Sequence, residues 1–284
     1  MSVIISTTDS GFSNRIKSLA SIMGRKEKYY VFWYKNALVE TKFSDLFEDA
    51  SMEVFRARRE LFYYRQNYIP IFKPKIHFSP YFDVSQFELG SYRSKPLYDG
   101  KKKKYLKINN GFSIDHMYND APQKITSIYR KRIRSLLPRK EIREAAKGFV
   151  NEVLQNEFLG VHIRTWSSIF LAHNETRRQK HFNPLHWINL IAERSNCVAS
   201  NVYIATDNLK VVKPIFENKI RNIFNRNDLE AWLLKYGLTF DTDQFAFLEI
   251  LVLSYSKELC ASVHSTFGEL AWYYNAKPVN VNVL

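Results

Sequence analysis

An arginine followed by hydroxyl-bearing residues stands directly after a short apolar segment in the second half of the chain. Residues 158–163 read FLGVHI, an apolar run broken only by His162, and Arg164 and Thr165 come next. A short apolar run with β-branched residues is typical of a buried strand. The planar guanidinium fork suits phosphate oxygens, so Arg164 is a candidate phosphate ligand, with pairing to a surface carboxylate as the alternative.

Two more predicted strands end in polar side chains. Asp207 follows the run VYIAT, and Ser262, Ser265 and Thr266 follow the run ELCA. In a parallel sheet these ends lie along one edge, where open α/β sheets bind their ligands. A cation, a carboxylate and several hydroxyls at that edge could hold a nucleoside diphosphate. The alternatives are helix N-capping by Ser265 and Thr266, and a loop or cap role for Asp207.

A similar arrangement opens the chain. Residues 3–6 are a β-branched run, a polar turn with Gly11 follows, and residues 12–24 carry apolar side chains at helical spacing. Asn14 and Arg15 fall near the first turn of this predicted helix, where backbone N–H groups without intrahelical acceptors favour an anion. We therefore predict the strand, loop and helix that begin an α/β domain.

These polar residues need a framework of alternating strands and helices. The predicted strands are residues 3–6, 29–34, 52–55, 158–163, 202–205, 219–224, 258–261 and 279–283. The predicted helices are residues 12–24, 43–46, 123–137, 141–154, 184–194, 210–218, 243–254 and 269–274. The alternation predicts an α/β protein with parallel sheets and two domains, residues 1–150 and 151–284. Four prolines interrupt residues 69–99, which are expected to form loops and short pieces.

The overall charge is strongly positive. The 284 residues include 42 Lys and Arg against 28 Asp and Glu, a formal net charge of +14, and 45% are hydrophobic. This length and composition predict a folded protein of one large or two ordinary domains. The charge favours an anionic partner, which could be nucleic acid, a membrane surface or a phosphate-bearing small molecule.

Several kinds of protein are not indicated. The only cysteines are Cys197 and Cys260, so we expect no disulfide framework and no cysteine-based zinc site, and a reducing compartment is favoured. Three histidines, His173, His181 and His186, are too scattered to predict a metal site. The N-terminus lacks the pattern of a signal peptide and no apolar stretch could span a bilayer, so we expect a cytoplasmic protein without a transmembrane segment.

Four motifs, taken together, resemble a known family. GFSNRIKSLAS, GVHIRTW, VYIATDN and LCASVHSTFGELAW, in this order and spacing, are similar to the fucosyltransferase superfamily of GT-B glycosyltransferases. That group includes the nodulation and core α-1,6-fucosyltransferases and the protein O-fucosyltransferases. The resemblance implies two Rossmann-like domains whose parallel sheets face each other across a cleft, with the nucleotide sugar held mainly by the C-terminal domain. It also implies inverting transfer that needs no metal or other cofactor.

The resemblance assigns roles to individual residues. It implies that Arg164 grips the diphosphate and stabilises it as the leaving group. The implied donor-binding residues are Gly11, Asn14, Arg15, His162, Asp207, Ser262, Ser265, Thr266 and Phe267. Many members of the α-1,6 branch carry two consecutive arginines, and the second position here is Thr165. The donor, GDP-fucose or another nucleotide sugar such as UDP-xylose, therefore stays open.

Inverting transfer also requires a base that takes the proton of the acceptor hydroxyl. Asp9, in the loop beside Gly11, is the first candidate, and its alternative role is the N-cap of the first helix. Asp115 and His116 are weaker candidates, and a histidine in an apolar strand, as at position 162, is more often a core residue than a catalyst.

The expected function is an inverting, metal-independent transfer of a sugar from a nucleotide-sugar donor to a glycan hydroxyl. One alternative is a nucleic-acid-binding protein, in which residues 56–65 and 101–104 form a basic, aromatic-rich groove. Another is a pseudoenzyme that only binds glycans. The acceptor, the linkage and the oligomeric state have no motif in this sequence.

Overall fold

The computed structural model describes residues 2–7, 11–23, 28–33, 39–48, 54–55, 75–79, 123–165, 183–198, 201–217, 219–262, 265–277, 279 and 281–284. Within these residues the chain forms two compact units, which are described separately. Unit 1 comprises residues 1–116, 121–140 and 241–244, and unit 2 comprises residues 117–120, 141–240 and 245–284.

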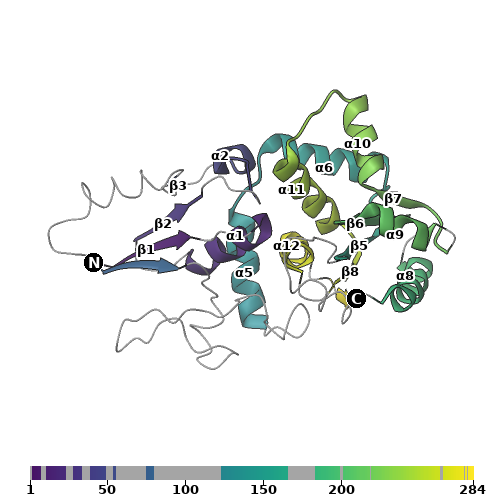
Figure 1. Cartoon of the computed structure of the whole chain (residues 1–284), viewed down its shortest axis with the longest axis horizontal. Coiled ribbons are helices and arrows are strands. Elements are labelled where there is room, and N and C mark those ends of the chain that lie inside the picture. The colour runs from purple at the N-terminus through teal and green to yellow at the C-terminus, as the bar shows by residue number, and fades with distance from the viewer. Residues whose placement is uncertain are drawn as a thin grey trace. The chain divides into compact units, whose positions relative to one another are not determined.

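Unit 1 contains a four-stranded parallel sheet in the order β3-β2-β1-β4 (Figure 1). The strands are β1 (Ser2–Thr7), β2 (Lys28–Phe32), β3 (Val54–Phe55) and β4 (Lys75–Ser79). The helices are α1 (Phe12–Ile22), α2 (Phe43–Leu46) and α5 (Gln123–Ser135). The opening strand and the helix predicted from the sequence are therefore present.

Strand β4 lies within residues 69–99, which were expected to form loops and short pieces and for which no strand was predicted. It pairs with β1 over five residues, from Ser2↔Lys75 to Ser6↔Ser79. Pro74 precedes the strand and Pro80 follows it. Neither proline therefore has to donate a hydrogen bond within the ladder, and β4 is an edge strand, where proline is tolerated best.

An aromatic cluster lies in the described core of unit 1. Trp33, directly after β2, contacts the rings of Phe12 and Phe43 edge-on, with centroids 6.3 and 5.3 Å away. Its indole N–H donates to the backbone oxygen of Thr41 at 3.0 Å. These contacts fix the first turn of α1 against the sheet, because Phe12 is the first residue of that helix.

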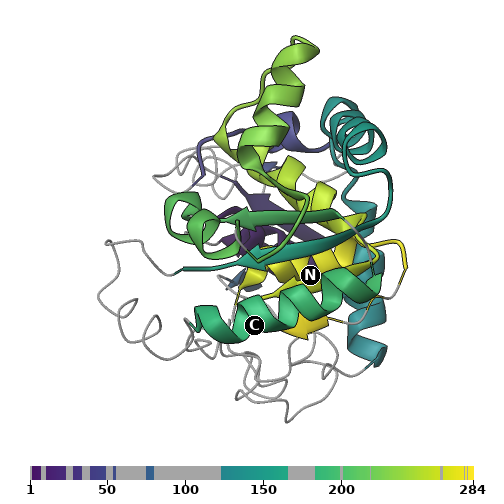
Figure 2. The same cartoon turned by 90° about the vertical axis from the view of Figure 1, so that its right-hand side faces the viewer.

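Unit 2 contains a five-stranded parallel sheet in the order β7-β6-β5-β8-β9 (Figures 1 and 2). The strands are β5 (Phe158–Ile163), β6 (Asn201–Thr206), β7 (Ile223–Asn225), β8 (Glu258–Ala261) and β9 (Val281–Val283). The helices are α6 (Lys140–Glu152), α8 (Pro184–Val198), α9 (Leu209–Phe216), α10 (Arg226–Lys235), α11 (Thr242–Ser254) and α12 (Thr266–Tyr274). Both sheets are parallel, which confirms the predicted α/β class.

Helices cover both faces of this sheet. Alternate residues of β5 and β6, such as Val161 and Ile204, join Trp187 of α8 and Phe216 of α9 in one buried cluster. Figure 2 shows α8 lying along this side of the strands. The residues between them point the other way and meet α6, α11 and α12. All six residues of β5 are buried, as expected for the central strand of a sheet covered on both sides.

The division into units differs in detail from the predicted domains. The predicted boundary after residue 150 falls inside α6, whose residues from Glu141 onward belong to unit 2. Phe149 explains why, since its ring packs 5.8 Å from Tyr203 of β6 and 6.0 Å from Trp232 of α10. Residues 241–244 belong to unit 1 although they lie near the end of the chain.

No helix in the described part of the chain is long and apolar enough to cross a membrane. The predicted cytoplasmic location stays a prediction.

Candidate functional site

The strand order of unit 2 places Arg164 at a point where open α/β sheets bind ligands. The chain runs outward from β5 to β6 and β7, then returns to the other side of β5 for β8 and β9. The order therefore reverses between β5 and β8, and ligands bind outside the carboxyl ends of strands at such a reversal. Arg164 directly follows β5, and Ser262 directly follows β8.

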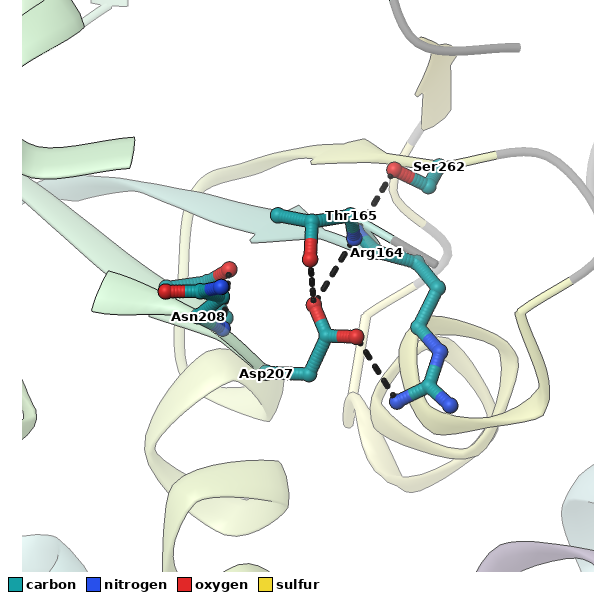
Figure 3. Close-up of polar contacts among 6 residues, drawn as sticks. Arg164, Thr165, Asp207, Asn208 and Ser262 are labelled. Atoms are coloured by element: carbon teal, nitrogen blue, oxygen red, sulfur yellow. Dashed lines mark hydrogen bonds and ion pairs between the residues drawn. The ribbon is translucent and has the colours of Figure 1, made fainter. Parts of the chain in front are cut away.

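Asp207 connects the end of β6 to the end of β5 (Figure 3). Its Oδ1 accepts hydrogen bonds from the backbone N–H and the hydroxyl of Thr165, at 2.7 and 2.9 Å. Its Oδ2 lies 3.2 Å from Nη1 of Arg164. The Arg164 side chain is 35% exposed and the Asp207 side chain 17%. Two of the predicted site residues, Arg164 and Asp207, thus meet, but through contact with each other.

Ser262 connects the same strand end to β8. Its Oγ accepts the backbone N–H of Arg164 at 3.0 Å, and its own N–H donates to the carbonyl of His162 at 3.0 Å. Ser262 is only 2% exposed. These bonds extend the β5–β8 pairing beyond the last strand residues, so Ser262 fixes the backbone from which the Arg164 side chain departs.

His162 is a buried, neutral histidine. Burial, helped by the positive charge of Arg164, lowers the pKa of His162 to about 3. Its ring stacks on Phe267 of α12, with centroids 4.9 Å apart and planes inclined by 20°. Its Nδ1 is buried and has no hydrogen-bond partner among the described residues. A buried polar atom of this kind usually has a partner, so Nδ1 is an acceptor or donor available to a ligand or a water.

The stack places the start of α12 beside the end of β5. Ser265 occupies the N-cap position of α12, and Thr266 and Phe267 form its first turn. The Ser265 side chain makes no capping hydrogen bond, so the capping alternative does not explain this serine. The first-turn N–H groups of a helix lack intrahelical acceptors and carry partial positive charge, which favours an anion.

The N-terminal motif lies in unit 1. Gly11 is the N-cap of α1, and a Cβ built there would meet nothing within 4 Å. Arg15 is 2% exposed and lies over the Trp33 ring, 5.3 Å from its centroid. The Oδ1 of Asn14 is buried without a hydrogen-bond partner among the described residues. The candidate bases Asp9, Asp115 and His116 lie outside the described residues.

Two features of this region were not predicted from the sequence. Thr165 was predicted only as a hydroxyl-bearing residue at the strand end, in the place of a second arginine, but it is 1% exposed and binds Asp207 with two groups. Ser262 was expected to bind a ligand, whereas its described contacts are to β5. Within the described ranges no three His, Cys, Asp or Glu side chains are grouped as a metal site would need.

Comparisons with models of protein families and with curated proteins gave no match. Comparison with solved structures gave several matches. Fucosyltransferase NodZ from Bradyrhizobium is 17% identical, with a TM-score of 0.52 over 95% of this chain and 91% of that one. A mutant of Arabidopsis thaliana FUT1 in complex with GDP is 13% identical, with a TM-score of 0.56 over 100% and 70%. POFUT1 in complex with GDP-fucose is 12% identical, with a TM-score of 0.51 over 99% and 97%.

These similarities cover 95–100% of this chain and therefore span both units. The TM-scores, all above 0.5, show a shared architecture, and at identities of 12–17% the reaction has to be argued from the site. The chain therefore has the fold of the GT-B fucosyltransferases, as its motifs predicted.

Proposed function

We propose that this protein is a glycosyltransferase that moves a sugar from a nucleotide-sugar donor to a hydroxyl of a glycan acceptor. The observation that carries the proposal is the position of Arg164 at the strand-order reversal of unit 2, two residues after His162, whose ring stacks on the first turn of α12. Proteins of the same fold have been solved with GDP-fucose or GDP bound, which makes a nucleotide sugar the first ligand to test.

The described groups fit a diphosphate. Arg164 supplies a cation, and the first turn of α12 supplies backbone N–H groups with the partial charge of the helix dipole. During transfer the bond between the anomeric carbon and the diphosphate oxygen breaks, and the nucleoside diphosphate leaves with the electron pair. A fixed guanidinium stabilises the negative charge that develops on that oxygen.

The transfer we propose inverts the anomeric carbon in one displacement. The acceptor oxygen attacks from the side opposite the leaving diphosphate, and a base removes its proton. Asp9 remains our candidate for that base, although it lies outside the described residues. We also propose that the reaction needs no metal, because Arg164 and the start of α12 can supply the positive charge that a metal would bring to the diphosphate.

The proposal leaves open which nucleobase and which sugar the donor carries. GDP-fucose is the first candidate, because NodZ was solved after soaking with it and POFUT1 in complex with it, and another nucleotide sugar such as UDP-xylose is a second candidate. Nucleic-acid binding, the alternative from composition, depended on residues 56–65 and 101–104, which lie outside the described residues. No observation on the described residues favours it over the nucleotide-sugar reading.

Thermal shift and turnover test the proposal together. We expect GDP or UDP at millimolar concentration, and the matching nucleotide sugar, to raise the melting temperature by mass action. We also expect slow hydrolysis of that nucleotide sugar without an acceptor. Stabilisation by an oligonucleotide alone would favour the nucleic-acid alternative. Binding of the nucleotide sugar without any turnover, with or without glycan acceptors, would favour a pseudoenzyme.

A further inference from the structure

The carboxylate of Asp207 is engaged on both oxygens by residues at the end of β5. Oδ1 accepts two hydrogen bonds from Thr165, and Oδ2 pairs with Nη1 of Arg164. A carboxylate oxygen has about two lone-pair directions, so the two donors of Thr165 fill Oδ1. A hydroxyl of the ribose or an N–H group of the base would have to share Oδ2 with the guanidinium. Asp207 is therefore poorly suited to the donor contact expected from the sequence.

The two partners of Asp207 are held to different degrees. Thr165 is 1% exposed, and its N–H and hydroxyl lie at 2.7 and 2.9 Å from Oδ1. The Arg164 side chain is 35% exposed and its Nη1 is 3.2 Å from Oδ2. A long, partly exposed side chain has many rotamers and loses entropy when it is ordered. The buried Thr165 contact thus anchors the carboxylate, and the carboxylate restricts the arginine.

The backbone of Arg164 is held from the opposite side. The hydroxyl of Ser262, beyond β8, accepts the Arg164 N–H at 3.0 Å (Figure 3). Asp207 comes from the neighbouring strand on the other side, β6. The strand end that carries the proposed diphosphate ligand is therefore held by both neighbours, one at the backbone and one at the guanidinium.

We propose that Asp207 is a positioning residue, which orients the guanidinium of Arg164 toward the diphosphate and does not bind the donor itself. This inference rests on the function proposed above. Orientation matters because an arginine that is already aligned loses little freedom when the ligand binds and when charge develops on the leaving oxygen. Thr165 takes part by anchoring Asp207, which gives this position a role different from that of a second arginine.

A competing account would make Asp207 a direct donor ligand, or a charge that only weakens the pull of Arg164 on the diphosphate. The accounts differ in how substitutions at positions 207 and 164 combine. If Asp207 acts through Arg164, replacing it matters only while the arginine is present. If it binds the donor independently, the two losses multiply. If it only competes, its removal raises donor consumption.

The test is a double-mutant cycle on the full chain with Asp207→Asn, Arg164→Lys and the double variant. The readout is kcat/KM for consumption of the nucleotide sugar, or the affinity for its nucleoside diphosphate where Arg164→Lys is inactive. We expect Asp207→Asn to lower the value about tenfold or more in the wild-type background. In the Arg164→Lys background we expect a change of less than about threefold.

Asn208→Ala is the matched control. Asn208 is the N-cap of α9 next to Asp207, and its side chain accepts the N–H of Val211 at 3.3 Å. Its loss should lower stability by about 1 kcal/mol, as for other N-caps, while leaving kcat/KM within about twofold. A variant that only loosens the loop would therefore not reproduce the effect of Asp207→Asn.

The outcomes separate this inference from the function beneath it. Equal losses from Asp207→Asn in both backgrounds, no loss in either, or a gain would overturn the positioning role alone. A wild-type protein that binds no nucleoside diphosphate and consumes no nucleotide sugar would overturn the proposed function, and this inference with it.

Discussion

Two buried ionisable residues of unit 2, Glu249 and His162, lie on the face of the sheet that α11 and α12 cover. Glu249 of α11 is 5% exposed and accepts a hydrogen bond from the hydroxyl of Tyr203 at 3.3 Å. Burial raises its pKa to about 7, against the opposing effects of Arg226 and of the Tyr203 bond. His162 lies on the same face and its pKa shifts in the opposite direction, since burial lowers it to about 3. For both residues, burial favours the neutral form of the side chain.

We predict that ionisation of Glu249 lowers the stability of the wild-type protein as pH rises. The Glu249→Gln variant should not show this decrease. The folded pKa of Glu249 is above its unfolded value near 4.5, so its contribution is fully present below pH 4.5 and is lost as pH rises through 7. The full loss is about 3 kcal/mol. In urea titrations from pH 4 to 8, the stability of the variant relative to wild type should grow by that amount.

The comparison between variant and wild type matters because His162 opposes this trend. Its folded pKa is below its unfolded value, so its contribution is present above pH 6.5 and is lost as pH falls toward 3. Between about pH 4.5 and 6.5 the contributions of Glu249 and His162 change in opposite directions, so they offset each other in the free energy of unfolding of the wild-type protein. A difference that stays constant from pH 4 to 8 would show that Glu249 is not buried as described.

At the residue scale, the sequence predicted which residues lie at the strand ends but not which contacts they make. The strand-end positions of Arg164, Asp207 and Ser262 were predictable, because the carboxyl ends of parallel strands share an edge. Their mutual contacts were not, since they depend on strand register and rotamer. The buried pairing of Tyr203 with Glu249 was also invisible, because residues 46 positions apart meet only once α11 packs on β6.

At the scale of elements, β5 approaches α11 closely because it contains a glycine. A Cβ added at Gly160 would lie 2.8 Å from Oγ and 2.9 Å from Cβ of Ser256, and 3.3 Å from a methyl group of Leu253. Ser256 follows α11, and its hydroxyl donates to the carbonyl of Leu253 at 2.8 Å. Gly160 thus sets the spacing between the strand that ends at Arg164 and the helix that covers it.

We predict that Gly160→Ala destabilises unit 2 by about 1–3 kcal/mol, because an added methyl group in a packed interior forces its neighbours apart. The measurement is the midpoint of urea unfolding. Combining it with Ser256→Gly removes the clashing atoms, so the double variant should lose less than the sum of the single losses. Additive losses would mean that the strand and the helix do not touch at this point.

Two elements, β4 and α10, were not predicted from the sequence, for different reasons. Strand β4 was missed because its flanking prolines were taken as breaks within a loop, whereas they mark its two ends. Helix α10 was not predicted, although Asn225 and Asp228 form a capping box at its start and Gly237 has φ of 64° just past its end. Those are ordinary helix-end signals, and reading them would have found the helix.

At the scale of the whole molecule, a short segment late in the chain belongs to unit 1. Both Glu40 and Thr41 donate their backbone N–H groups to Oδ2 of Asp243, at 2.7 and 2.9 Å. The Thr41 hydroxyl donates to Asp241 at 2.7 Å. No sequence pattern predicts this attachment, because it joins positions about 200 residues apart. The predicted division at residue 150 could not have included it.

We predict that Asp243→Ala destabilises unit 1 by about 2–4 kcal/mol, because two backbone N–H groups lose a charged acceptor and at least one of them is buried. Asp243→Asn keeps a carbonyl oxygen in place and should cost less. Thermal unfolding of both variants gives the comparison. Equal melting temperatures for wild type and Asp243→Ala would show that the segment 241–244 does not hold unit 1 together.

The central claim is that Arg164, at the strand-order reversal of unit 2, binds a diphosphate. Calorimetric titration of the wild-type protein and of Arg164→Ala with GDP and with UDP tests it most directly. We predict saturable binding of at least one of them by the wild type and a loss of about tenfold or more in affinity for Arg164→Ala, with its melting temperature unchanged. Equal affinity of the two proteins, or no binding by the wild type, would contradict the claim.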